Sequence, residues 1–177
     1  MALWGMAMAA NGDVWVHRPV ARARALADRA VALRYRLSRQ GKSLTARENA
    51  YLDGFVRLQR TGGTRAGRRA WLDSLREVGR GHPEDREAKA FLAFALLKND
   101  HLYKPDGSSY LTRPSAAFLR EGDGLVDRVL AEQPDHPAHH YKIHIWDYHE
   151  PERARGSTDP IGPSEPRIAH MWHMAGH

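Results

Sequence analysis

The sequence has 177 residues, 42% of them hydrophobic and 27% charged, which is ordinary for a globular protein and argues against disorder. It contains no cysteine, so disulfides and thiolate metal sites are excluded. No apolar stretch approaches the roughly 18–20 residues that cross a bilayer, and we expect a soluble chain with no membrane partner.

The net charge of +6 comes from arginine, because the chain has 22 arginines and only 5 lysines. The arginines are spread over several expected helices, whereas a nucleic-acid interface needs a clustered basic stripe. We interpret them as solvated helix faces and do not expect a nucleic-acid partner. The first residues lack the basic segment of a signal peptide, and the compartment and oligomeric state stay open.

Apolar residues recur at helical spacing along most of the chain. In chain order, helices are expected at residues 2–10, 19–40, 45–59, 64–80, 83–98, 114–133, 137–150, 151–158 (short and poor) and 166–177. Thr45 and Glu48 have the spacing of a capping box at the start of the third helix. No segment alternates apolar and polar residues long enough to predict a sheet.

Three features are expected to break this pattern. Residues 99–113 form the longest loop. Gly122 and Gly124 interrupt the helix that contains them near its middle. Residues 158–166 are expected to be a loop, because they contain Pro160, Gly162, Pro163 and Pro166.

These elements predict an all-α fold of about eight or nine helices in an array of α-hairpins. One hairpin cannot bury its apolar face, but stacked neighbours can. Residues 1–177 are expected to form a single helical-repeat domain. It begins inside what should be a first repeat helix and stops without a capping helix, so we expect truncation at both ends.

Histidine is concentrated near the C-terminus, where eight of the 11 histidines lie in the last 42 residues. His140 and His144 are four residues apart and Asp147 follows three later, so all three share one helical face. A histidine pair at this spacing is a chelating geometry, because both rings reach one ion without backbone distortion.

The last expected helix carries a second row, with the spacing i, i+3, i+7, made of His170, His173 and His177. Two packed helices would direct four or five imidazoles and the Asp147 carboxylate at a common point. Such ligands suit Zn²⁺, Fe²⁺ or Cu²⁺, and also Ni²⁺ or Mn²⁺, so the identity of the transition metal stays unknown. Asp147 is either a ligand or an outer partner that orients a histidine.

Two alternatives to a metal site remain. The histidines could form a buried hydrogen-bonded network with Asp and Tyr side chains, or line a metal-free groove for a substrate or peptide. Met171 and Met174 are more simply core residues than copper ligands. The remaining histidines, His17, His82, His101, His136, His139 and His149, are interpreted as surface, capping or isolated structural residues.

Two motifs resemble a group of bacterial tetratricopeptide-repeat proteins. These are the HY-x-IH pattern at residues 140–144 and the HM-x-x-H pattern at 173–177. The opening segment at residues 2–9 and the phrase at residues 88–93 are also similar to that group. Helix junctions rich in proline recur near residues 81–85, 133–137 and 162–166, as between tetratricopeptide repeats.

The resemblance implies a tetratricopeptide-like α-hairpin solenoid with irregular repeats, and it carries His140, His144, His173 and His177 over as motif positions. The sequence departs at Ala175, where the group has proline, which leaves the angle between His173 and His177 open. Two functions follow as hypotheses: a scaffold with a transition-metal site, or a metal-free module that binds a protein or peptide in its concave groove. No catalytic residue or reaction class is supported.

Overall fold

The computed structural model describes residues 1–11, 21–61, 64–99, 102–103, 109–110, 115–147 and 149–177. Within these ranges the fold is all-α apart from one pair of two-residue strands, as the sequence predicts. Helices pack mainly against their neighbours in chain order. The chain divides into two compact units, residues 1–85 with 101–112, and residues 86–100 with 113–177. Whether both belong to one continuous repeat domain stays a prediction.

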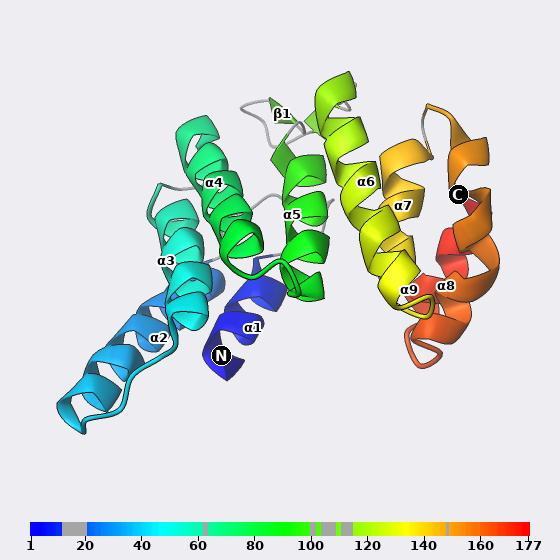
Figure 1. The fold of residues 1–177 in the computed structure, drawn as a ribbon. Coiled ribbons are helices and arrows are strands. Elements are labelled where there is room, and N and C mark those ends of the chain that lie inside the picture. Colours follow the sequence, from blue (N-terminus) through cyan, green and yellow to red (C-terminus); the bar gives the residue numbers. More distant parts are fainter. Residues whose placement is uncertain (12–20, 62–63, 100–101, 104–108, 111–114, 148) are drawn as a thin grey trace. The chain divides into compact units, whose positions relative to one another are not determined.

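In its described residues the first unit contains four helices, α1 (Ala2–Ala10), α2 (Ala21–Arg39), α3 (Ala46–Arg60) and α4 (Arg65–Gly81). Figure 1 shows α3 beside α4, and α1 packs on α2. Trp4 of α1 donates from its indole nitrogen to the Tyr51 carbonyl at 3.2 Å. Phe55 of α3 meets Trp71 of α4 edge-on, with ring centroids 5.8 Å apart. These contacts form the core of the unit.

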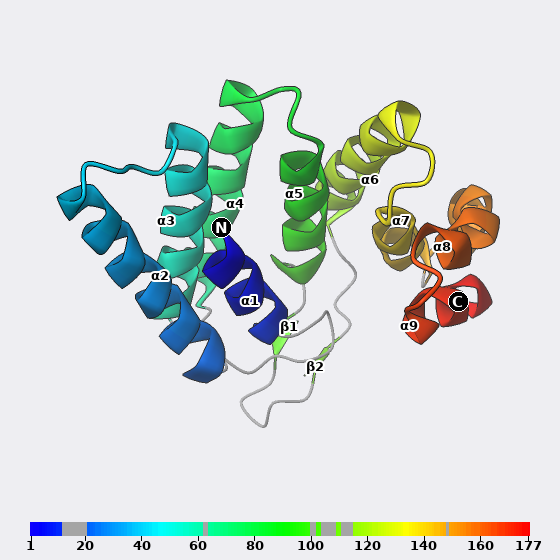
Figure 2. The same ribbon diagram turned by 90° about the horizontal axis from the view of Figure 1, so that it is seen from below.

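The same unit includes an antiparallel pair of short strands, β1 (Leu102–Tyr103) and β2 (Ser109–Tyr110), drawn in Figure 2. The sequence analysis expected an unbroken loop at 99–113 and no sheet, so this prediction was wrong for the four strand residues. Two residues per strand are too few to give an alternating pattern, and only the pairing of the backbone reveals them.

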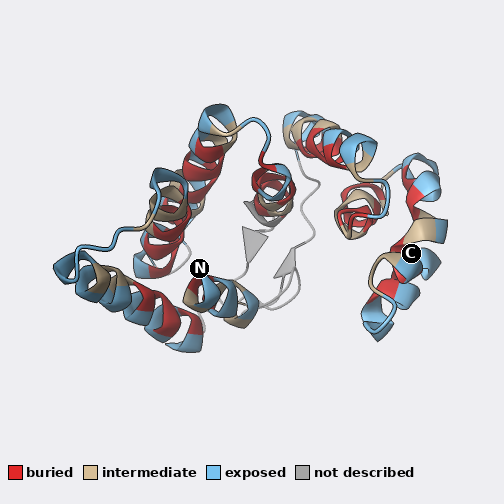
Figure 3. Cartoon of the chain, turned by 60° about the horizontal axis from the view of Figure 1, so that its bottom comes forward, coloured by how far each residue is buried: buried red, intermediate tan, exposed pale blue. Residues whose placement is uncertain are grey.

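The second unit contains five α-helices in its described residues, α5 (Arg86–Asn99), α6 (Ala116–Glu132), α7 (His139–Trp146), α8 (Thr158–Ser164) and α9 (Ala169–His173), with two 3-10 segments, η1 (Pro151–Ser157) and η2 (Met174–Gly176). The helix α6 packs on α5 and on α7, while α8 packs on η1, α7, α9 and η2. Figure 3 shows that within this unit the buried residues lie on the faces turned toward neighbouring helices.

Helix boundaries follow the sequence closely where local chemistry sets them. Thr45 and Glu48 form the predicted capping box at the start of α3, with the Thr45 hydroxyl accepting from the Glu48 amide at 3.2 Å. The expected helix starts at Pro83, Pro114 and Pro137 lie two or three residues before the observed helices, in turns or outside the described residues. The expected start of the second helix, at Pro19, lies outside the described residues as well.

Two predictions on the second unit were wrong. Residues 158–164 form the helix α8 instead of a loop. Pro160 lies in its first turn, where amides have no partner within the helix, whereas Pro163 lies inside the helix and removes one amide hydrogen bond near its end. The helix α6 runs without interruption through Gly122 and Gly124, because Gly122 is packed against Ile145 of α7.

The C-terminal helix is also shorter than predicted. It begins at Ala169 instead of Pro166, and after His173 it tightens into the 3-10 segment η2. The helix expected to reach residue 150 ends at Trp146.

Among the described residues, no helix combines the length and the apolar character needed to cross a membrane.

We predict that Thr45→Ala lowers the free energy of unfolding by about 1 kcal/mol, because it removes the hydroxyl that caps α3. The hydrogen bonds from Thr45 hold the pKa of Glu48 below its usual value. A lowered carboxyl pKa stabilises the fold above the unfolded pKa, and this contribution is lost as pH falls through the folded pKa. The destabilisation caused by Glu48→Gln should therefore shrink in acid.

Denaturant unfolding as a function of pH measures both effects. The control is Glu77→Gln, an exposed residue within α4. Equal losses for Glu48→Gln and Glu77→Gln at neutral pH would contradict the proposed role of the capping box.

Candidate metal centre

Three of the predicted ligand residues belong to α7. His140 and His144 lie one turn apart on this helix, and Asp147 follows as its C-terminal capping residue. The opposite side of α7 is apolar, with Ile143 and Trp146 only 2% and 3% exposed. Burial of one face therefore determines which way the histidine face points.

The buried carboxylate of Asp123 on α6 holds α7 in place. Its Oδ1 accepts a hydrogen bond of 2.6 Å from the Trp146 indole and lies 2.6 Å from the Lys142 ammonium. Arg153 of η1 lies 3.6 Å from the same carboxylate and stacks 3.8 Å from the centroid of the Trp146 ring. A buried charge with these partners is satisfied, and it joins α6, α7 and η1.

The other histidines lie on α9 and at the end of η2. Two methionines anchor these short segments, since Met171 and Met174 are 5% and 0% exposed. Their role as core residues is therefore confirmed. Trp172 of α9 lies against Gly162 of α8, and its indole nitrogen donates to the Pro166 carbonyl at 3.1 Å. Only a glycine at 162 leaves room for the ring.

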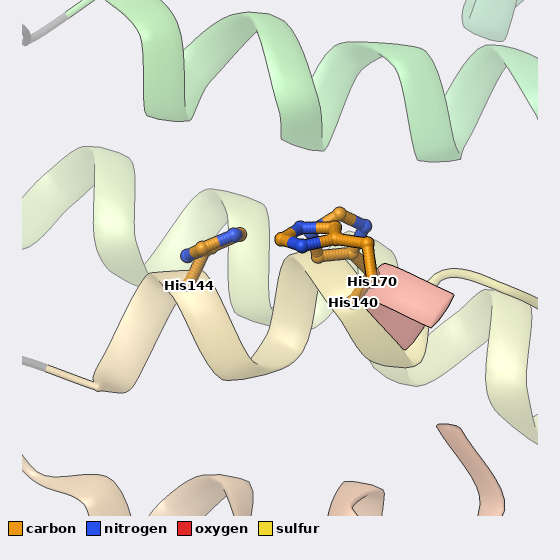
Figure 4. Close-up of side chains that lie close together, drawn as sticks. All are labelled: His140, His144 and His170. Carbon is orange, nitrogen blue, oxygen red and sulfur yellow. The ribbon is translucent and has the colours of Figure 1, made fainter. Parts of the chain in front are cut away.

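The first group of close ligands joins α7 to α9. The Nε2 atoms of His140 and His170 lie 3.3 Å apart, and the rings of His140 and His144 have centroids 4.8 Å apart. One ligand atom from each of these three histidines lies within 4.8 Å of the others. Figure 4 shows one ring nitrogen of His144 turned toward His140 and His170, and the other turned away.

The second group is centred on a carboxylate. The Oδ2 atom of Asp147 lies 3.2 Å from Nδ1 of His144 and 3.1 Å from Nδ1 of His177. The Asp147 side chain is only 3% exposed, and its Oδ1 atom is buried without a hydrogen-bond partner in the described part of the chain. A buried carboxylate in this position needs positive charge close by.

His173 completes the cluster. Its Nε2 lies 3.2 Å from Nε2 of His177, and its ring stacks on that of His170 with centroids 5.8 Å apart. The six predicted residues therefore form a closed circuit of contacts, which we call the histidine cluster. It consists of His140, His144, Asp147, His170, His173 and His177.

The histidine cluster is open on one side. His144 is buried and His140 is half-buried, whereas His170 and His173 are exposed. An ion can therefore reach the imidazoles from solvent. Two apolar residues beside them, Ile168 and Trp172, are 48% and 55% exposed.

Two histidines interpreted from sequence as surface or capping residues are buried, since His136 and His139 are 6% and 5% exposed. His136 does cap the start of α7, because its Nδ1 accepts from the Ala138 amide at 3.0 Å. His139 bonds to the Ser157 hydroxyl at 2.9 Å and to the Pro134 carbonyl at 2.8 Å. No sequence pattern links His139 to Ser157, which folds against it from η1.

Burial also sets the protonation of two neighbours of the cluster. It lowers the pKa of His139, with opposition from the hydrogen bond to the Pro134 carbonyl. It raises the pKa of Tyr141 to about 12, helped by the negative charge of Glu87. The Tyr141 phenol is therefore neutral at physiological pH.

Of the other histidines, His82 caps the end of α4 and its Nδ1 lies 3.5 Å from a Glu84 oxygen. His17 and His101 lie outside the described residues.

Comparison of the chain with protein-family models, with curated proteins and with solved structures finds no match. The function is therefore argued from the geometry of the histidine cluster.

We predict that Gly162→Ala disturbs the packing of α9 against α8. An added Cβ would lie 2.5 Å from the Trp172 ring, so the ring and its helix have to shift. The expected loss is about 1–3 kcal/mol of unfolding free energy. Most of it should disappear when Trp172→Ala is added, because the obstructing ring is then absent.

Thermal and denaturant unfolding of the four proteins in this double-mutant cycle measure the coupling. Gly156→Ala is the matched control, because nothing lies within 4 Å of the Cβ that it would add. Additive losses from Gly162→Ala and Trp172→Ala would contradict the proposed contact.

Proposed function

We propose that the histidine cluster binds a transition-metal ion through His140, His144 and His170. The observation that carries the proposal is the convergence of these imidazoles from two separate helices, with Nε2 of His140 and of His170 only 3.3 Å apart. Two nitrogens bound to one tetrahedral ion at roughly 2.0–2.1 Å lie about 3.3 Å apart. His140 and His170 therefore have the spacing of two ligands of one ion, and a ligand atom of His144 lies within 4.8 Å of theirs.

The chemistry of the donor set points to a borderline metal. Neutral imidazoles without thiolate suit Zn²⁺, Fe²⁺ or Cu²⁺, and these are the ions that we propose. Three protein ligands leave one position of a tetrahedral ion for water or another ligand. Because His170 is exposed, that position would be accessible from solvent. A metal-dependent reaction would need such a position, and no reaction class is proposed.

The competing function is a metal-free module in which the same histidines form a hydrogen-bonded network. The contacts between Nε2 atoms, 3.2 and 3.3 Å, also suit an N–H···N hydrogen bond. Packing of consecutive helices such as α3 with α4 and α5 with α6 supports a tetratricopeptide-like scaffold. A protein or peptide partner in a groove of that scaffold stays a prediction.

Metal analysis separates the two functions. We expect untagged protein incubated with Zn²⁺ and then passed through a desalting column to retain at least one equivalent of zinc. His140→Ala/His144→Ala should retain one equivalent less, because it removes two of the three proposed ligands. Elemental analysis of the desalted proteins is the measurement.

The matched control is His82→Ala/His149→Ala, which removes two histidines outside the cluster. It should retain as much zinc as the unchanged protein. An unchanged protein that retains no stoichiometric zinc, or equal retention by all three proteins, would refute the metal site and leave the hydrogen-bonded network.

A further inference from the structure

The six residues of the histidine cluster do not surround a single point. Two groups of three residues have ligand atoms within 4.8 Å of one another, and they share only His144. His173 belongs to neither group, yet its Nε2 lies 3.2 Å from Nε2 of His177. This second pair has nearly the spacing of the first pair, His140 and His170.

Hydrogen bonds to Asp147 determine which ring nitrogen of His144 and of His177 carries the proton. Its Oδ2 can accept hydrogen bonds only if Nδ1 of His144 and Nδ1 of His177 carry protons. In a neutral ring the proton on Nδ1 puts the lone pair on Nε2, which is the atom that a metal would bind. One carboxylate therefore fixes the same tautomer in two histidines, as carboxylates do for metal-bound histidine in many sites.

The two oriented histidines then face different partners. One nitrogen of His144 is turned toward His140 and His170 in Figure 4, while Nδ1 meets Asp147. His177 directs Nδ1 to Asp147 and Nε2 to His173. Two neutral rings cannot both point lone pairs at each other across 3.2 Å without a proton or a cation between them.

We propose that the centre is dinuclear, with one ion held by His140, His144 and His170 and a second by Nε2 of His173 and His177. Asp147 is a positioning residue that accepts an N–H hydrogen bond from one histidine of each proposed ligand set, His144 for the first ion and His177 for the second. The inference rests on the proposed metal binding and adds a second cation position to it. Two histidine ligands would leave the remaining coordination positions of the second ion to water.

Charge favours this arrangement. Two divalent cations in one cluster repel each other, and five neutral imidazoles cannot offset that repulsion. Asp147 contributes a negative charge that is only 3% exposed and hydrogen-bonds to a ligand of each ion. Its interaction with both cations is strengthened by the limited exposure to water. The buried carboxylate is in turn satisfied by the positive charge of the two metal–imidazole groups.

Zinc stoichiometry tests the second position. Titration of the metal-free, full chain with Zn²⁺ alone, followed by calorimetry and elemental analysis, should give two equivalents. His173→Ala and His177→Ala should each retain one equivalent with the affinity of the first position. His173 is exposed, so its replacement removes no core contact and leaves the fold intact.

Asp147→Asn tests the positioning role, and Asp127→Asn is the control because Asp127 is an exposed carboxylate in the same unit. Asp147→Asn should weaken zinc binding by about 10- to 100-fold at both positions, with Asp127→Asn unchanged. Circular dichroism of the metal-free variants checks folding. A folded Asp147→Asn protein with unchanged affinities would overturn the positioning role.

The outcomes separate this inference from the proposed function. One equivalent in the unchanged protein, or two equivalents retained by His173→Ala, overturns the second position and leaves a mononuclear site. Complete loss of one equivalent in Asp147→Asn, with two retained by His173→Ala, would make Asp147 a ligand instead. No bound zinc in the unchanged protein overturns both proposals.

Discussion

A carboxylate buried between imidazoles is the constraint on which the histidine cluster depends. The Asp147 side chain is 3% exposed, and its two ion-pair partners among the described residues are His144 and His177, 30 residues beyond it in the chain. Its negative charge is stable there only while those rings donate to it or carry a metal. The carboxylate therefore links the end of α7 to the end of η2.

The faces of α7, α9 and η2 that point away from the histidine cluster are packed in the core, and this packing fixes the positions of the histidines. The Trp146 indole donates a hydrogen bond to Asp123 of α6. Met174, in the C-terminal segment, is fully buried. Side chains that bind an ion need supports that hold them within a fraction of an ångström, and rigid helices supply such supports better than loops. Within the cluster, His140 and His144 lie on α7, which is held by core packing, whereas His170 and His173 lie exposed on α9.

Helix boundaries could be predicted from the sequence where they depend on residues close together in the chain. The capping box of Thr45 and Glu48 and most boundaries of α1 to α6 depend on residues within one turn. The helix α8 was missed because prolines usually end helices, yet Pro160 occupies the first turn, where the lost amide costs little, and Pro163 lies close to the end of the helix. The pairing of β1 with β2 was missed because two residues carry no periodicity.

The sequence by itself determined the all-α class and the composition of the candidate site. The spacing of His140 and His144 places both on one face of a helix, and spacing is a local property. Only the tertiary structure decided that His170 meets His140, that Asp147 contacts both His144 and His177, and that His139 is buried on Ser157. Those contacts join segments as much as 30 residues apart, and their geometry is set by how α7, α8 and α9 pack.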